Sequence, residues 1–156
     1  MHRDPARAIL DSVRRIVRAL RLGSRRSESK VGLSGAQLFV LQTLGAAEPL
    51  SINALAERTF THQSSVSIVA SRLEAAGLLR RTRSDRDGRS RQVSLTAKGR
   101  GVLRERVDLG QSKLLGGIAR LSAAERRALA RLLDKMVRSA ELSDLPPTMF
   151  FEGDKS

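Results

Sequence analysis

Residues 63–91, QSSVSIVASRLEAAGLLRRTRSDRDGRSR, combine two local patterns that together indicate the fold. In its first half, apolar residues recur at spacings of three and four, which is typical of the buried stripe of a helix that stops at Gly77. Its second half is rich in Arg, and Asp87-Gly88 lies where two short strands would turn. The stretch therefore predicts a helix, over residues 62–76, followed by a basic β-hairpin with strands at 78–82 and 91–95.

The buried stripe of this helix assigns its other side chains to the exposed surface by elimination. The buried set is Val66, Val69, Ala70 and Leu73, and the exposed set is Gln63, Ser64, Ser65, Ser67, Ile68, Ser71 and Arg72. Short polar side chains allow a helix to lie deep in the major groove, and most of them can bond base edges or phosphates. The alternative is a solvated helix face with no binding role. The neighbouring Arg residues favour the first interpretation.

Two further helices are predicted upstream of residue 62. Ser34 and Gln37 form a capping-box pattern that predicts a helix over residues 35–46, and Ser51 caps a helix over 52–58. Thr61 is expected to cap the helix described above. Two helices joined by a short turn, the second ending in Gly, are typical of a helix-turn-helix. With the basic hairpin, they predict a winged helix-turn-helix that grips DNA.

Long amphipathic segments flank this region on both sides. We expect a first helix from Pro5 to about Leu22-Gly23, a loop over residues 24–30, and a helix over residues 97–120. The glycines of this last helix, Gly99 among them, weaken it and predict close helix contacts or a bend near Gly116-Gly117. A second capping box, at Ser122 and Glu125, opens a final helix that ends near residue 141. An apolar tail follows over residues 142–151. Apolar helix faces of this size, next to so small a domain, predict a dimer.

Composition and charge limit the possible partners. The chain has 156 residues, 40% of them hydrophobic, and a net charge of +13, which favours a polyanion such as nucleic acid. An Arg-rich surface without a partner is the other explanation. Long apolar runs are missing, as is a secretory signal, so we expect a cytoplasmic protein with no membrane contact. The sequence has no Cys and only two His, which argues against a metal site or any cofactor.

Enzyme classes find little support in the sequence. No Ser-His-Asp or paired-carboxylate constellation stands out, and no Gly-rich phosphate loop follows a strand. Gln37 and Phe39 could line a ligand pocket, although a core position is the simpler assignment for an apolar helix face. The sequence therefore favours a binding protein over a catalyst.

The hairpin and the residues around it resemble the MarR family of bacterial transcription regulators. Asp87 and Arg89, followed by Val93, Leu95-Thr96 and Gly99, are similar to the wing signature of that family, and residues 33–78 match its helix-turn-helix in order and spacing. The resemblance implies an obligate homodimer that binds a pseudo-palindromic operator, usually as a repressor released by a small ligand. Such ligands are often aromatic or anionic.

The resemblance also assigns roles to wing residues. Arg89 corresponds to the wing Arg expected in the minor groove, with Asp87 supporting it, and Arg86 and Arg91 are expected to join Arg72 in contacting DNA. Ile68 departs from the family pattern, in which many members carry a basic or polar residue at this position. Contact with thymine methyl groups is one role open to it.

These observations predict a mainly α fold with a small β-hairpin wing. Residues 31–96 are expected to form the winged helix-turn-helix, and residues 1–30 and 97–156 the helical dimerisation region, within one structural domain. The predicted function is a sequence-specific regulator that binds double-stranded DNA. A nonspecific or architectural DNA-binding protein is the alternative, and a winged helix used for protein contacts is a third possibility.

Overall fold

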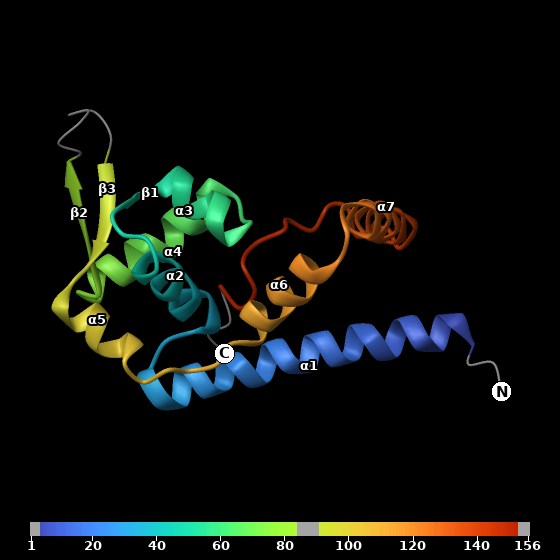
Figure 1. The fold of residues 1–156 in the computed structure, drawn as a ribbon, viewed down its shortest axis with the longest axis horizontal. Helices are drawn as coiled ribbons and strands as arrows, with labels where there is room; N and C mark the ends of the chain where they lie inside the picture. Colours follow the sequence, from blue (N-terminus) through green and yellow to red (C-terminus); the bar gives the residue numbers. More distant parts are fainter. Residues whose placement is uncertain (1–3, 84–90, 153–156) are drawn as a thin grey trace.

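A computed structural model describes residues 4–83 and 91–152. These residues form seven α-helices and a three-stranded sheet (Figure 1). The elements are α1 (Pro5–Val31), α2 (Gly35–Gly45), β1 (Leu50–Ser51), α3 (Ile52–Thr59), α4 (Gln63–Ala75), β2 (Leu79–Arg83), β3 (Arg91–Leu95), α5 (Ala97–Leu103), α6 (Gly110–Arg120) and α7 (Ala123–Ser139). The predicted fold class, mainly α with a small β wing, is confirmed.

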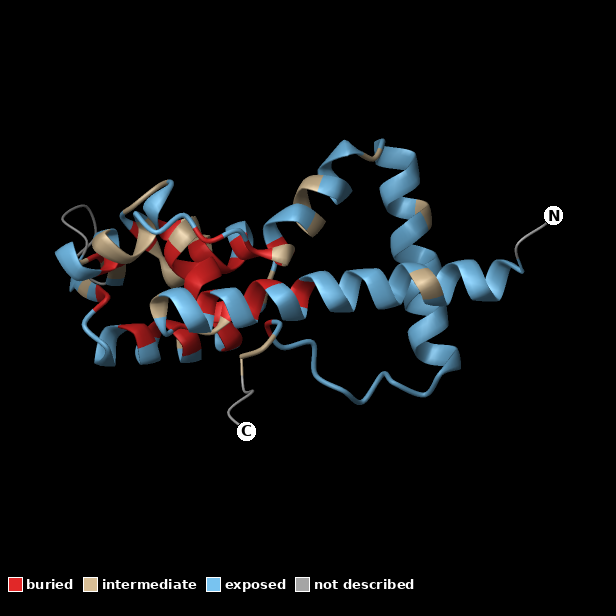
Figure 2. Cartoon of the chain, turned by 90° about the horizontal axis from the view of Figure 1, so that it is seen from below, coloured by how far each residue is buried: buried red, intermediate tan, exposed pale blue. Residues whose placement is uncertain are grey.

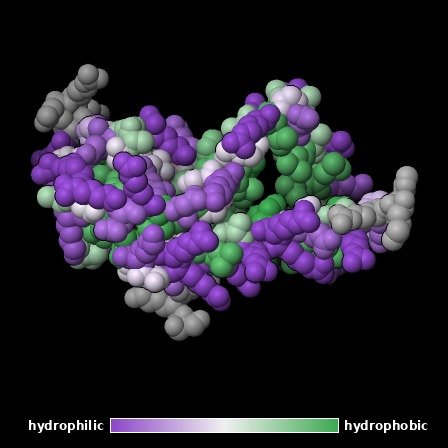
Figure 3. Space-filling model, turned by 60° about the horizontal axis from the view of Figure 1, so that its bottom comes forward, coloured by the Kyte–Doolittle hydropathy of each residue, from purple (hydrophilic) through white to green (hydrophobic). Residues whose placement is uncertain are grey.

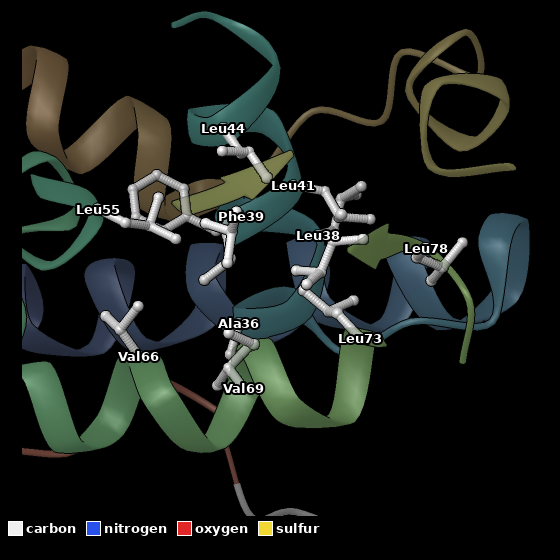
Figure 4. Packing of buried hydrophobic residues seen from close by; sticks show 14 of the residues in the cluster. Ala36, Leu38, Phe39, Leu41, Leu44, Leu55, Val66, Val69, Leu73 and Leu78 are labelled. Atoms are coloured by element: carbon white, nitrogen blue, oxygen red, sulfur yellow. The ribbon is translucent and has the colours of Figure 1, made fainter. Parts of the chain in front are cut away.

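The hydrophobic core lies at the junction of α2, α3, α4 and the sheet. Figure 4 shows α2 contributing side chains along its length, with Leu55 of α3 and Val66, Val69 and Leu73 of α4 packed against them. The predicted buried stripe of α4 is thus confirmed. Phe39 and the apolar part of α2 belong to this core, while Gln37 completes the capping box, its Oε1 accepting the N–H of Ser34 at 3.0 Å.

The sheet has the order β1-β3-β2 and is antiparallel throughout. β2 and β3 are the predicted hairpin strands, paired from Leu79 with Leu95 to Arg83 with Arg91. The prediction missed β1, whose Leu50 pairs with Val93. A two-residue strand carries no alternation pattern that could reveal it, and its main effect is to cover the second edge of β3.

The first helix is longer than predicted. α1 does not end at Gly23 but continues through residues 24–30 to a left-handed cap at Gly32, φ 69°. Ser24 and Ser27 are buried, and Ser24 Oγ accepts the N–H of Gly35 at 3.0 Å, so these polar residues pack against the start of α2. The predicted loop over residues 24–30 is wrong, because these polar residues continue the helix and two of them are buried.

Gly23 has a packing role within α1. A Cβ at this position would lie 2.7 Å from the backbone nitrogen of Gly110, at the start of α6. The glycine therefore allows two backbones to approach closely, which is why a residue that usually weakens a helix is tolerated here.

The predicted helix over residues 97–120 is broken in two. α5 ends at Leu103, Arg106 adopts a positive φ of 46°, and α6 begins at Gly110. The break lets Val107 and Leu109 reach the core, where they are buried. Close contacts occur at Gly99 and Gly110, where a Cβ would meet the backbones of Leu78 and Ala19. At Gly116-Gly117 α6 continues unbroken, and no atom of the described residues lies within 4 Å of a Cβ there.

The capping box of α7 is confirmed. Ser122 Oγ accepts the N–H of Glu125 at 3.2 Å, and a carboxylate oxygen of Glu125 accepts the N–H of Ser122 at 2.7 Å. These hydrogen bonds with the backbone and side chain of Ser122 lower the pKa of Glu125 from its usual value. The contribution of the charged carboxylate to stability is therefore present at neutral pH and is lost as the pH falls through that lowered pKa.

α7 and the first half of α1 project away from the core (Figure 2). Along α7 no residue is buried, and its apolar side chains are exposed, with Leu132 at 54%. Ile9 and Leu10 of α1 are each 52% exposed. Figure 3 shows apolar surface around the opening between these two helices. Within the described chain these faces have no apolar cover.

The tail after α7 returns to the core. Met149 is only 3% exposed and joins the hydrophobic cluster, as expected of an apolar tail, while Leu142 and Leu145 remain exposed. In Figure 1 the tail runs from α7 back toward the body of the molecule. It therefore connects the projecting helix to the region that contains α4.

Candidate nucleic-acid interface

α4 presents a polar face on the side opposite the core. Gln63, Ser64 and Ile68 are exposed and Ser67 is half-buried. Ser71 and Arg72 extend this surface toward the C-terminal end of α4. Most of these side chains are short, so the helix backbone can approach a groove closely, and the hydroxyl and amide groups can bond base edges or phosphates.

Ser65 does not belong to this face. It is only 6% exposed, because it lies four residues before Val69 and shares the buried side of the helix with it. The prediction that Ser65 faces outwards is therefore wrong, and Ser65 is left out of the proposed DNA contacts.

The turn before α4 is held by hydrogen bonds of buried Thr59. Its hydroxyl donates to the carbonyl of Leu55 at 2.9 Å. Phe60 follows in the left-handed conformation, φ 52°, and ends α3. Thr61 donates to the carbonyl of Thr59 at 3.0 Å instead of capping α4, so the predicted Thr61 cap is wrong. This arrangement fixes the direction in which α4 leaves the turn.

The N-terminus of α4 is available to an anion. Its N-cap residue, His62, makes no side-chain capping hydrogen bond within the described chain. The first N–H groups of a helix have no partner inside the helix and carry partial positive charge. A DNA phosphate is a suitable acceptor for them. Exposed His62 and Gln63 flank this end.

Ile68 is 48% exposed in the middle of the polar face. An apolar side chain at this point cannot hydrogen-bond a base edge, but it can contact the methyl group of thymine in the major groove. The structure thus confirms that Ile68 faces outward, as the sequence predicted.

The C-terminal half of α4 is held by other parts of the chain. Arg81 of β2 donates to Ser71 Oγ at 2.9 Å, and its Nε lies 3.2 Å from Glu74 Oε2. Arg72 donates to the carbonyl of Glu152, in the tail, at 2.5 Å. The helix is therefore fixed against both the wing and the tail at this end, while its N-terminal half faces solvent.

The wing strands carry exposed positive charge. Arg80, Arg83 and Arg91 are exposed, and Arg83 lies opposite Arg91 in the antiparallel register. Like charges directly opposite each other are unfavourable unless an anion lies between them or close by. This end of the hairpin is thus well suited to a phosphate backbone. Arg86, Asp87 and Arg89 lie outside the described residues.

The base of the wing is fixed by Glu48. One carboxylate oxygen accepts the N–H of Leu95 at 2.5 Å, and the other pairs with Arg100 at 2.5 Å. Thr96 and Lys98 also donate to the carbonyls of Gly77 and Ala76, at 2.7 and 2.9 Å. The hairpin therefore leaves the body of the protein in a defined direction relative to the end of α4.

Sequence reasoning missed Arg81 and Glu48. Arg81 had a detectable signal, since it follows buried Leu79 by two residues along β2 and so shares its inward face, where an Arg is unusual. Glu48 had no detectable signal in the sequence, because its contacts join residues about 50 positions apart.

Residues 4–83 and 91–152 contain no group of three His, Cys, Asp or Glu residues that could hold a metal ion. Among the helices of these residues, none is long and apolar enough to cross a membrane.

A small hollow lies where the tail meets α1 and α6. Leu20, Ser24, Gln111, Phe150 and Phe151 are among its lining residues, and its volume is about 10 Å³. Pockets for small molecules usually measure about 300–1,000 Å³. This hollow would have to open before it could accept a small organic ligand.

Comparisons with known proteins agree with this geometry. The sequence profile described as the MarR family matches residues 31–90. The chain is 32% identical to the transcriptional repressor MdtR of Bacillus subtilis over 119 residues, which cover 76% of each protein. It is 30% identical to the transcriptional repressor Rv2887 of Mycobacterium tuberculosis over 69% of this chain and 78% of that protein.

Solved structures share the fold. The transcriptional regulator BldR of Sulfolobus solfataricus aligns with a TM-score of 0.57 at 28% identity, over 89% of this chain and 99% of that one. Bordetella bronchiseptica BpsR, described with regulation of its DNA binding by 6-hydroxynicotinic acid, aligns with a TM-score of 0.56 at 26% identity, over 87% and 97% of the chains.

Proposed function

Because the chain belongs to the MarR family of transcription regulators, we propose that it represses transcription by binding a pseudo-palindromic DNA site as a homodimer. The family consists of DNA-binding regulators and not of enzymes. The observation that supports the finer proposal best is the exposed polar N-terminal half of α4, on a helix whose C-terminal half contacts the basic wing.

In the proposed complex, α4 enters the major groove. Gln63, Ser64 and Ser67 bond base edges or phosphates, and Ile68 contacts thymine methyl groups. Arg91 contacts the backbone, together with the wing residue Arg86. Arg72 is proposed to contact a phosphate with those guanidinium nitrogens that Glu152 does not engage.

Dimerisation is proposed through the exposed apolar faces of α1 and α7. These faces carry Ile9, Leu10, Val13, Ile16 and Val17 on α1 and Leu129, Leu132, Leu133, Met136 and Val137 on α7. Contiguous exposed apolar surface of this kind usually marks an interface. A two-fold dimer would place two α4 helices about 34 Å apart, which is one turn of DNA, and so would favour a palindromic site.

A selection from a random duplex pool tests sequence specificity. We expect the bound sequences to share a pseudo-palindrome, and the selected site to bind at least about 10³-fold more tightly than a scrambled duplex at the same salt concentration. Equal binding of both duplexes would instead support the nonspecific or architectural alternative. A complete lack of salt-dependent DNA binding would support a protein-contact role.

The wing residue Arg89 gives a second prediction. Replacing Arg89 by Ala is expected to weaken binding to the selected site by roughly tenfold, because an Arg in a narrow minor groove is favoured by its negative potential. Fluorescence anisotropy measures the affinity, and circular dichroism checks the fold. Unchanged affinity would contradict the assignment of Arg89 to the DNA.

An aromatic or anionic effector is proposed to release the DNA. The effector named for BpsR is an aromatic acid, and the Arg-rich α1 would attract an anion. We expect benzoate and its hydroxylated relatives, used as probes, to raise the melting temperature of the protein and to lower its affinity for the selected site. If no aromatic carboxylate changes either quantity at millimolar concentration, an effector of this class is ruled out.

A further inference from the structure

Arg81 of β2 makes two contacts with α4. Its Nη2 donates to Ser71 Oγ at 2.9 Å, and its Nε lies 3.2 Å from Glu74 Oε2, although that N–H does not point at the carboxylate oxygen. The Arg81 side chain is 23% exposed, much less than expected for a solvated strand cation. One guanidinium group thus joins the wing to the C-terminal half of the recognition helix.

The charge of Arg81 is already satisfied within the protein. Glu74 lies beside it, whereas Arg83, two residues along the same strand, is exposed and lies opposite another Arg. In the register of the sheet, Arg81 pairs with buried Val93. Its side chain therefore lies over the body of the domain and not on the exposed end of the hairpin.

We infer that Arg81 is a positioning residue, which sets the angle between wing and recognition helix so that both can contact one DNA duplex. A guanidinium group suits this role because it donates to Ser71 Oγ while its charge lies beside the Glu74 carboxylate. The inference rests on the proposed function, since a wing that did not contact DNA would not need this alignment.

Replacing Glu74 tests the inference, because the expected change in DNA affinity is opposite to the change that charge repulsion alone would give. Removing a carboxylate from a helix that lies in the groove would ordinarily strengthen DNA binding, because it removes repulsion from phosphates. If Glu74 holds Arg81, however, Glu74→Gln weakens binding to the selected site by several-fold. Tighter binding by this variant would contradict the inference.

Arg81→Met provides the direct test, with Arg83→Met as its control. Both variants remove one cation from the same face of β2. A phosphate contact contributes about 0.9 to the slope of log K against log salt. We expect Arg81→Met to bind the selected site about tenfold more weakly than the unchanged protein does, with the same slope of log K against log salt. At high salt, where phosphate contacts contribute less, Arg81→Met is expected to lose more affinity than Arg83→Met. A slope lowered by about 0.9 would make Arg81 a phosphate contact and overturn the positioning role.

A double-mutant cycle completes the experiment. If the pair acts as a unit, the variant that combines Arg81→Met with Glu74→Gln binds DNA no more weakly than Arg81→Met alone. Additive losses would show that the two side chains act separately and would overturn the inference. The unchanged protein is titrated in parallel, since its failure to bind any duplex would instead refute the proposed function.

Discussion

Replacing Leu132 by Asp is expected to convert the dimer into a monomer that remains folded. Leu132 is 54% exposed on α7, so the fold of the single chain does not depend on it, whereas an interface would bury the new carboxylate against apolar side chains. Loss of the second half-site contact should weaken binding to the palindromic site by about 10²-fold or more. Light scattering after size exclusion measures the mass, and circular dichroism measures the helix content.

Arg131→Asp is the matched control for this prediction. It places the same carboxylate on the polar side of α7, where the helical period turns it away from the apolar stripe. This variant should remain dimeric. The interface on α7 would be contradicted by a Leu132→Asp protein that stays dimeric at micromolar concentration.

Replacing Gly99 by Ala is expected to destabilise the fold by about 3 kcal/mol. A Cβ on Gly99 would overlap the carbonyl oxygen of Leu78, which also accepts the N–H of Thr96 at 3.1 Å. Backbone atoms tied in this way cannot shift as a flexible side chain could. The start of α5 must therefore move away from the sheet, and the base of the wing with it.

Gly101→Ala is the control within the same helix. No atom of the residues that the structure describes lies within 4 Å of a Cβ at Gly101, so Ala should be neutral or stabilising by up to about 1 kcal/mol. Urea unfolding followed by circular dichroism compares the variants. Equal stability of the two Ala variants would show that the close approach at Gly99 has no energetic consequence.

Local patterns predicted most of the fold. The stripe of Val66, Val69 and Leu73 identified α4, and the capping boxes at Ser34 and Ser122 gave the starts of α2 and α7. Each of these signals comes from residues within one or two helical turns. A single sequence carries that information directly.

The errors occurred where distant contacts decide the outcome. Ser24 and Ser27 are polar, yet they are buried against α2 and extend α1 beyond Gly23. Gly99 appeared to weaken a helix, but it permits the contact with Leu78. The helix break before Gly110 allows Val107 to enter the core, and no local signal reports such a need.

In the candidate site, too, local patterns gave correct predictions and tertiary contacts were missed. The helical period correctly assigned Gln63, Ser64 and Ile68 to the exposed face, but elimination placed Ser65 there too, although it borders the buried stripe and is covered. Arg72 contacts Glu152, 80 positions away, and Arg81 contacts Glu74 across the turn that joins α4 to β2. Which Arg residues are free to contact DNA therefore depends on the tertiary structure.

Methylation interference on the selected site tests the central claim, that α4 reads the major groove in two symmetric half-sites. Methylation of guanine N7 places a methyl group in the major groove. We expect such methylation to block binding at two clusters of positions, centred about 10 base pairs apart. Equal binding of methylated and unmethylated duplexes at every guanine would contradict this claim.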